Sequence, residues 1–243
     1  MWALYQKEIR SFLVSLTGML VIGFFLVITG LFIWVLPFGT NILDSGYANL
    51  DGLFLLAPFV FLFLVPAISM RSFAEEKKSG TLELLLTRPL SELQIVMAKY
   101  LATYTLVVLA LLPTLIYYFS VQRLAYPVGN VDSGGFWGSF GGLLFLGAAF
   151  TAIGFFCSSL TDNQIVAFLL AVILSAFLYK GFELISPLFG EYSLLVQNLG
   201  MDAHYRSMSR GVIDTRDLIY FLSQIALFIY MTTYSLARRK WSV

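Results

Sequence analysis

Long apolar stretches alternate with short polar ones along almost the whole chain. A membrane helix needs about 20 apolar residues, because each residue adds about 1.5 Å along the axis and the hydrocarbon core is about 30 Å thick. Six runs have this length, at residues 15–36, 52–70, 97–120, 137–158, 164–186 and 218–237. The pattern predicts an all-α, polytopic membrane protein with six transmembrane helices and a single membrane domain over residues 1–243.

The stretch between the fifth and sixth predicted spans is ambiguous. Residues 184–199 are moderately apolar, but Pro187, Gly190 and Glu191 interrupt them. This outer segment is either a loop or a re-entrant or interfacial segment that enters the bilayer without crossing it.

Composition supports a membrane protein and excludes several classes of function. Hydrophobic residues make up 59% of the chain and charged residues only 12%, about half the share of a soluble domain, and the mean hydropathy is +0.84. The net charge of +1 provides no basic field for nucleic acid. The single cysteine, Cys157, excludes an internal disulfide and offers no metal cluster, so we expect a small packing residue.

The distribution of lysine and arginine sets the predicted orientation. One side of the membrane would carry ten of these residues and the other five, and the richer side faces the cytoplasm. Both termini are then cytoplasmic, and residues 71–96 form the only sizeable cytoplasmic loop. Lys7 and Arg10 precede the first run as in a signal peptide, but the run stays uncharged from Ser11 to Leu43, so we interpret it as a retained span.

The loop between the second and third spans carries local signals of short helices. The signals are capping boxes at Ser72–Glu75 and Ser91–Gln94, a left-handed helix end at Gly80, a helix cap at Thr81 and a helix stop at Pro89. Two interpretations remain open. The loop is either a solvated amphipathic connector or a docking elbow that transmits force from a soluble protein into two membrane helices.

Both interpretations place the same side chains in water. Glu75, Glu76, Lys77 and Glu83 would be solvated, whereas Phe73 and the neighbouring leucines would face lipid or other spans. The close spacing of caps and stops, together with the mixture of charge signs, argues against a passive connector, but the residues alone leave both interpretations open.

The same loop resembles the signature of ABC-2 type transporter permeases. The matching segments are Phe73–Glu76, Ser79–Leu85, Arg88–Ser91 and Lys99–Ala102. A second similar segment, Ser209–Leu222, enters the last span, and the closing Arg238-Arg239-Lys240-Trp241 also fits. Within this family the chain looks most like the F-type permease of the gliding-motility-associated ABC system of Bacteroidetes.

The resemblance implies a non-catalytic membrane subunit of an ATP-binding-cassette exporter in a bacterial inner membrane. The family's first cytoplasmic loop holds a coupling helix that sits in a cleft of a separate ATPase dimer, and a second permease subunit, a copy or a related chain, completes the assembly. Carried over by position, the ATPase-coupling residues would be Phe73, Glu75, Glu76, Gly80, Thr81 and Glu83. ATP and Mg would bind the partner, because this chain has no Gly-x-x-x-x-Gly-Lys-Ser/Thr loop and is expected to bind no cofactor or metal.

Two further sets of residues are candidates outside the loop. Lys180 and Glu183 lie three residues apart on one helical face, as a gate, a substrate contact or an interfacial pair. His204, the only histidine, is expected to be neither ligand nor catalyst. Small residues spaced by four in the fourth span allow close helix approach, within the chain or between subunits, and these are Gly138, Gly142, Ala148 and Ala152.

Three other functions compete with that of an exporter permease. An ion-coupled transporter usually has ionisable residues within the membrane, and no Asp or Glu falls in the middle of a predicted span. An intramembrane enzyme needs a nucleophile beside a base, and serines such as Ser158 and Ser175 have no histidine in a span to pair with. A membrane scaffold that an ATPase moves without solute transport stays open, and the sequence carries no recognisable pattern for a substrate.

Overall fold

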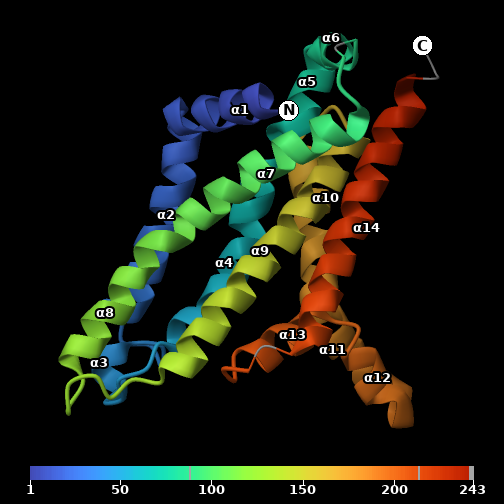
Figure 1. Ribbon diagram of the computed structural model, residues 1–243. Coiled ribbons are helices and arrows are strands. Elements are labelled where there is room, and N and C mark those ends of the chain that lie inside the picture. Colours follow the sequence, from blue (N-terminus) through green and yellow to red (C-terminus); the bar gives the residue numbers. More distant parts are fainter. Residues whose placement is uncertain (88, 213, 241–243) are drawn as a thin grey trace.

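Each predicted apolar run folds as a long helix in the computed structural model (Figure 1). The structure describes residues 1–87, 89–212 and 214–240, without the side chains of residues 16, 17, 86, 239 and 240. These residues form no strand. The spans are α2 (Leu16–Trp34), α4 (Asp51–Ser69), α7 (Glu92–Leu111) continued by α8 (Leu115–Leu124), α9 (Ser133–Leu160), α10 (Gln164–Ala176) with the helical turns that follow it, and α14 (Thr215–Lys240).

Length and apolarity together allow five or six membrane crossings in the described part of the chain. Five helices qualify as spans on their own, and a bent pair, α1 (Trp2–Val14) followed by α2, makes a sixth. The expectation of an all-helical, multi-pass membrane protein is therefore confirmed.

The first span is preceded by a helix that the hydrophobic pattern did not predict. α1 meets α2 at 65° and lies across the end of the bundle (Figure 1). At the bend, the Ser15 hydroxyl donates to the Phe12 carbonyl and accepts from the Gly18 N–H. The helix buries Leu4 and leaves Lys7 exposed, and such amphipathic helices lie in the interface plane of a membrane.

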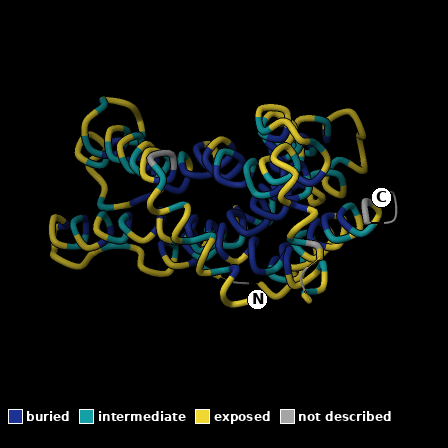
Figure 2. The backbone as a smooth tube through the Cα atoms, turned by 90° about the horizontal axis from the view of Figure 1, so that it is seen from above, coloured by how far each residue is buried: buried dark blue, intermediate teal, exposed yellow. Residues whose placement is uncertain are grey.

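Helix α9 is the centre of the bundle. It packs against α4, α7, α10 and α14, and 78% of its most apolar window is buried, against 28% for α10 and its continuation and 22% for α14. Figure 2 shows the buried residues gathered along the middle of the molecule. Among the five helices that qualify as spans on their own, α10 and α14 therefore expose the most apolar surface.

Two of the spans contain an irregular helical turn. Pro113 interrupts the third span as the 3-10 turn η1 (Leu112–Thr114), whereas α4 continues through Pro58 and Pro66. The fifth span ends in a π-helical turn, η2 (Phe177–Gly181), and such turns are frequent at functional sites.

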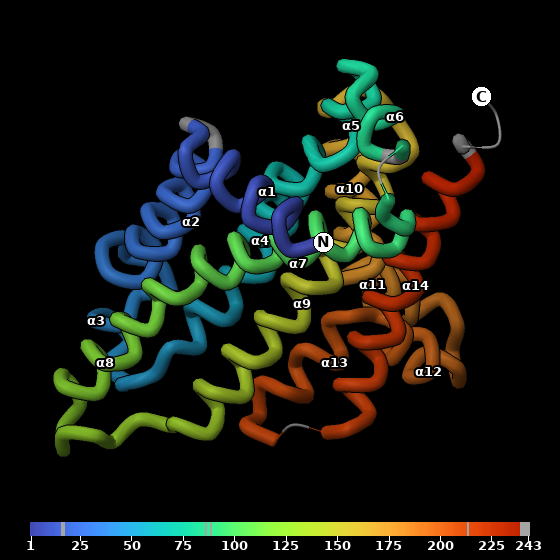
Figure 3. Tube along the Cα trace, turned by 45° about the horizontal axis from the view of Figure 1, so that its top comes forward, coloured from blue at the N-terminus to red at the C-terminus, as the bar shows by residue number. Residues whose placement is uncertain are grey.

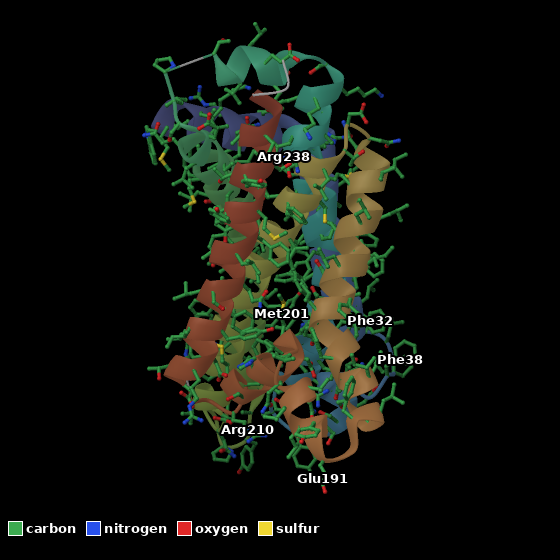
Figure 4. All side chains as sticks on the ribbon, turned by 90° about the vertical axis from the view of Figure 1, so that its right-hand side faces the viewer. Phe32, Phe38, Glu191, Met201, Arg210 and Arg238 are labelled. Atoms are coloured by element: carbon green, nitrogen blue, oxygen red, sulfur yellow. The ribbon has the colours of Figure 1, made fainter. Side chains whose placement is uncertain are left out.

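The outer segment after the fifth span is mostly helical and returns toward the bundle. It comprises α11 (Phe182–Ile185), η3 (Ser186–Tyr192), α12 (Ser193–Gln197) and α13 (Met201–Met208), and a short helix, α3 (Ile42–Ser45), lies at the same end. Figure 4 shows Met201 deeper in the molecule than Glu191 and Arg210. Residues 184–199 are covered almost entirely by α11, η3 and α12 rather than by irregular loop. The following helix, α13, buries Met201, Tyr205 and Met208 in the bundle.

The loop between the second and third spans lies at the opposite end. It forms α5 (Arg71–Lys78) and α6 (Thr81–Leu86), and Figures 1 and 3 show these helices at the end of the molecule where α1 and the last turns of α14 lie.

Close packing of α4 on α9 gives a test of this architecture. A Cβ atom at Gly154 of α9 would lie 2.8 Å from the Cβ of Ser69 on α4, so Gly154→Val must push the two helices apart. We expect a loss of about 1–3 kcal/mol, measured as a lower Tm of the detergent-purified chain. Gly141→Val on the same helix meets no atom within 4 Å and is the control. An equal Tm for both variants would contradict the packing.

Candidate functional site

We define the elbow as α5 and α6 with the turn between them. Some of the local features that the sequence predicted for it are present and others are not. Gly80 adopts φ +70 and reverses the chain, a conformation that favours glycine, and Glu83 lies in the first turn of α6. The capping box of Ser91 and Gln94 opens α7, with hydrogen bonds of 3.3 and 3.1 Å. These local predictions are confirmed, and α6 ends at Leu86, before Pro89.

Two local predictions in the elbow are wrong, because the expected side-chain caps at Ser72 and Thr81 do not form. α5 begins at Arg71 directly after a helical Met70, so no capping box forms between Ser72 and Glu75. Thr81 is the first residue of α6 rather than its cap, and its hydroxyl hydrogen-bonds the Ser79 hydroxyl at 2.8 Å.

The backbone at the start of α5 is held instead by a serine from α9. The buried hydroxyl oxygen of Ser158 accepts from the N–H groups of Phe73 and Ala74, each at 3.1 Å, and its hydroxyl donates to the Met70 carbonyl at 2.9 Å. Sequence reasoning noted this serine only as a weak candidate nucleophile. Its position near the end of an otherwise apolar run was the signal for a capping role.

The inner face of the elbow packs into the bundle. Phe73 is fully buried, and its ring meets that of Phe155 edge-on at a centroid distance of 5.5 Å. Leu82 is buried as well, and the Lys77 ammonium donates to the Ser159 carbonyl. The prediction that Lys77 stays in water is therefore wrong, because its ammonium finds an acceptor at the end of α9.

A buried lysine ties the elbow to two further helices. Lys99 on α7 is 2% exposed, and its ammonium lies 2.7 Å from the Glu76 carboxylate on α5 and 3.2 Å from the Glu8 carboxylate on α1. It also donates to the Ser72 carbonyl at 3.1 Å. The prediction that Glu76 is solvated is wrong, because a buried ammonium requires a carboxylate partner.

The outer face of the elbow is open to the surroundings. Glu75, Gly80, Thr81 and Glu83 are exposed, and so is Leu84, at 69%. Beside them lies a recess of about 490 Å³ between α1, the elbow and α7, which residues of both charge signs line. Four of the six residues assigned to ATPase coupling thus face outward, whereas Phe73 and Glu76 face inward.

At the opposite end, the structure brings Lys180 and Glu183 together in a ring of four charges. The Lys180 ammonium lies 2.6 Å from Glu183 and 2.9 Å from Asp202. Arg206 closes the ring, at 3.0 Å from Glu183 and 2.9 Å from Asp202. The ring joins the fifth span to α13, and Asp202 and Arg206 were not predicted as members because their spacing to Lys180 is not local.

The remaining contacts of α13 make it a fixed part of the bundle. The ring nitrogens of His204 lie 2.7 Å from the Asp217 carboxylate and 2.9 Å from the Asn198 carbonyl. Both nitrogens are thus engaged in contacts that hold the structure together. The Tyr205 hydroxyl donates to the Phe54 carbonyl on α4 at 2.8 Å. Burial raises the pKa of Tyr205, so its phenol keeps the proton that it donates.

The four small residues of the fourth span all lie in contacts within the chain. A Cβ at Gly138 would lie 2.9 Å from Gly211, and one at Gly142 would lie 3.0 Å from the Tyr205 ring. Ala148 and Ala152 are buried, and the Ala148 carbonyl accepts from the Tyr100 hydroxyl at 3.1 Å. The structure thus uses this spacing for packing inside one chain.

Residues 40–197, well over half of the chain, match the ABC-2 family transporter proteins. The chain belongs to this family. It is therefore a multi-pass, non-catalytic membrane permease subunit, and ABC-2 permeases work with an ABC ATPase. A search among curated proteins finds no match.

The family match covers the elbow and not the later motifs. The resembling segment Ser209–Leu222 and the closing residues from Arg238 lie beyond residue 197. Three residues of the resembling segments lie outside the described residues, and these are Arg88, Ile213 and Trp241.

The ion pairs of Lys99 predict a measurable contribution to stability. Lys99→Met leaves two partly buried carboxylates without their shared cation, and we expect a loss of about 2–4 kcal/mol. Thermal unfolding of the purified chain measures it. Lys7→Met is the control, because Lys7 is exposed and lies 3.7 Å from the same Glu8. A Tm as high as that of the control would contradict the role of Lys99.

The hydrogen bonds of Ser158 predict a local effect on the elbow. Ser158→Ala leaves the N–H groups of Phe73 and Ala74 buried without an acceptor, at a cost of about 1–3 kcal/mol. Hydrogen exchange of the peptide covering α5 should become faster by at least about fivefold, since 1 kcal/mol corresponds to a factor of about five. Ser120→Ala, which removes an exposed hydroxyl bonded only within its own helix, is the control. Unchanged exchange would show that another group holds the elbow.

Proposed function

We propose that this chain is the permease half of an ATP-driven exporter and that the outer face of its elbow docks into a separate ATPase. The proposal rests on one observation: the tip of the elbow is exposed, whereas its inner side is buried and bonded to the bundle. Glu75, Thr81, Glu83 and Leu84 project outward, while the same two helices are fixed from behind by Ser158 and Lys99.

The buried contacts of the elbow determine which helices would move when a force acts on it. α5 continues directly from α4, is bonded to α9 through Ser158, and is bonded to α7 and α1 through Lys99. A displacement of α6 therefore moves the ends of four other helices together instead of bending a flexible loop. Such packed elements with discrete arrangements are what carry motion between distant sites.

The chemistry of the outer face fits a protein cleft. It combines two carboxylates, Glu75 and Glu83, with the apolar side chain of Leu84, and interfaces of this kind gain orientation from the charges and affinity from the apolar anchor. We infer that the ATPase cleft presents basic side chains around an apolar pocket. The recess beside the elbow leaves room for side chains of that partner.

The topology agrees with a cytoplasmic position of the elbow. α1, the elbow and the last turns of α14 share one end of the molecule, and ten of the fifteen Lys and Arg residues belong to that end in the predicted topology. We propose that this end faces the cytoplasm of a bacterial cell and that ATP and Mg bind only to the ATPase dimer docked there.

We propose further that the second permease of the two-fold assembly is a different chain, as in the gliding-motility systems that the sequence resembles. The support is the likeness of the elbow segments and of Ser209–Leu222. The genes next to this one test the proposal directly. An ATPase gene together with a second permease gene supports it, whereas an ATPase gene alone favours two copies of this chain.

Charge reversal on the outer face tests the docking. Glu83→Arg should leave the fold intact, because the side chain is exposed, but should weaken co-purification of the ATPase by about tenfold or more, since a cation would meet the basic cleft. Asp162→Arg is the matched control, an exposed acid that follows α9 outside the elbow. Equal co-purification of the ATPase with Glu83→Arg and with the wild type would refute the assignment.

A further inference from the structure

A groove runs along the outside of the bundle between α9 and α14, at the end that carries the elbow. Its volume is about 300 Å³, and we call it the lateral groove. Figure 4 looks toward α14, with Arg238 near the elbow end of that helix. The lining residues are Phe156, Leu160, Tyr230, Met231, Tyr234, Ser235 and Arg238.

The side chains from α14 form a stripe whose character changes along its length. Tyr230, Tyr234 and Arg238 are spaced by four residues, so they follow one another on one face of the helix. Phe156 and Leu160 of α9 have the same spacing and form the apolar opposite wall. The groove is thus apolar and aromatic along the span and cationic only where α14 reaches the membrane surface.

The dimensions favour a narrow chain over a helix as the occupant. From Tyr230 to Arg238 the groove is about 12 Å long, at about 1.5 Å per residue. A volume of about 300 Å³ then corresponds to a mean cross-section of about 25 Å². A helix of about 10 Å diameter has a cross-section of about 80 Å² and could lie only partly in the groove, whereas a single hydrocarbon chain fits within it.

The electrostatics at the elbow end favour a negative charge on the occupant. Among the seven lining residues, all of them described, Arg238 is the one cation and there is no carboxylate. A second cation, Lys77, reaches the Ser159 carbonyl, to which the Ser235 hydroxyl of the groove also donates at 3.3 Å. Basic pockets between membrane helices at the cytoplasmic surface bind anionic lipid head groups.

We propose that the lateral groove binds one anionic phospholipid. One acyl chain lies between α9 and the Tyr230–Tyr234 stripe, and the phosphate accepts hydrogen bonds from the guanidinium of Arg238, with the Tyr234 hydroxyl one helical turn below it. Aromatic side chains with polar tips are suited to this depth of the bilayer. The inference uses no contact of the elbow with an ATPase, so it stands or fails separately from the proposed function.

Lipid titration of the purified full chain tests the site. The delipidated protein in detergent is titrated with phosphatidylglycerol and with phosphatidylcholine of equal chain length, and the bound lipid is counted by native mass spectrometry. We expect one phosphatidylglycerol to bind at least about fivefold more tightly than phosphatidylcholine, and Arg238→Gln to remove that preference, because one cation near the surface contributes about that factor.

Two further variants separate the groove from the general surface. Leu160→Trp fills the groove from its exposed rim and should weaken both lipids, whereas Leu227→Trp, an exposed α14 position outside the groove, should weaken neither. Lys78→Gln, an exposed cation of the elbow, should keep the preference for phosphatidylglycerol.

Three results would overturn the proposal. The first is equal affinity of the wild type for the two lipids. The second is a loss of preference in Lys78→Gln as large as in Arg238→Gln, which would indicate a general surface charge effect. The third is efficient cross-linking of Tyr234→Cys to another permease chain in intact membranes, because the groove would then be a protein interface.

Discussion

The buried ammonium of Lys99 is the constraint on which the elbow end of this molecule depends. A charge removed from water must be paired, and the acceptors that pair it come from α1 and α5. The position of Lys99 on α7 therefore fixes where the amphipathic first helix crosses the bundle and how the elbow is turned. The 65° bend between α1 and α2 brings Glu8 to this lysine, and the inward face of α5 brings Glu76.

The elbow combines a rigid interior with an open exterior, and the two are made by neighbouring residues. Phe73 and Glu76 point inward to α9 and Lys99, whereas Glu75 and Glu83 point outward. Ser158 supplies the backbone acceptor that a local cap would otherwise provide. At the other end, the charge ring around Lys180 fixes α13 to the fifth span in the same way. Each end of the bundle is thus held by a small polar cluster on an apolar frame.

The sequence was sufficient for the spans and insufficient for the polar contacts. Apolar length predicted a helix for every run, but it gave no sign of the π-helical turn near Lys180 or of α13 returning into the bundle. Local rules placed Gly80 and the capping box at Ser91 correctly, because those signals involve residues three or four apart. They failed at Glu76, whose partner lies on another helix, and sequence spacing carries no information about that distance.

Site-specific cross-linking from the tip of the elbow in intact cells tests most directly whether the elbow docks to an ATPase. A photo-reactive residue replaces Leu84, which is 69% exposed, and in a second strain it replaces Leu188, which is 83% exposed at the far end. The account predicts a cross-link between the elbow probe and a nucleotide-hydrolysing cytoplasmic protein, and none from the far-end probe. A nucleotide-hydrolysing partner captured only at Leu188, or an elbow accessible from outside the cell, would contradict it.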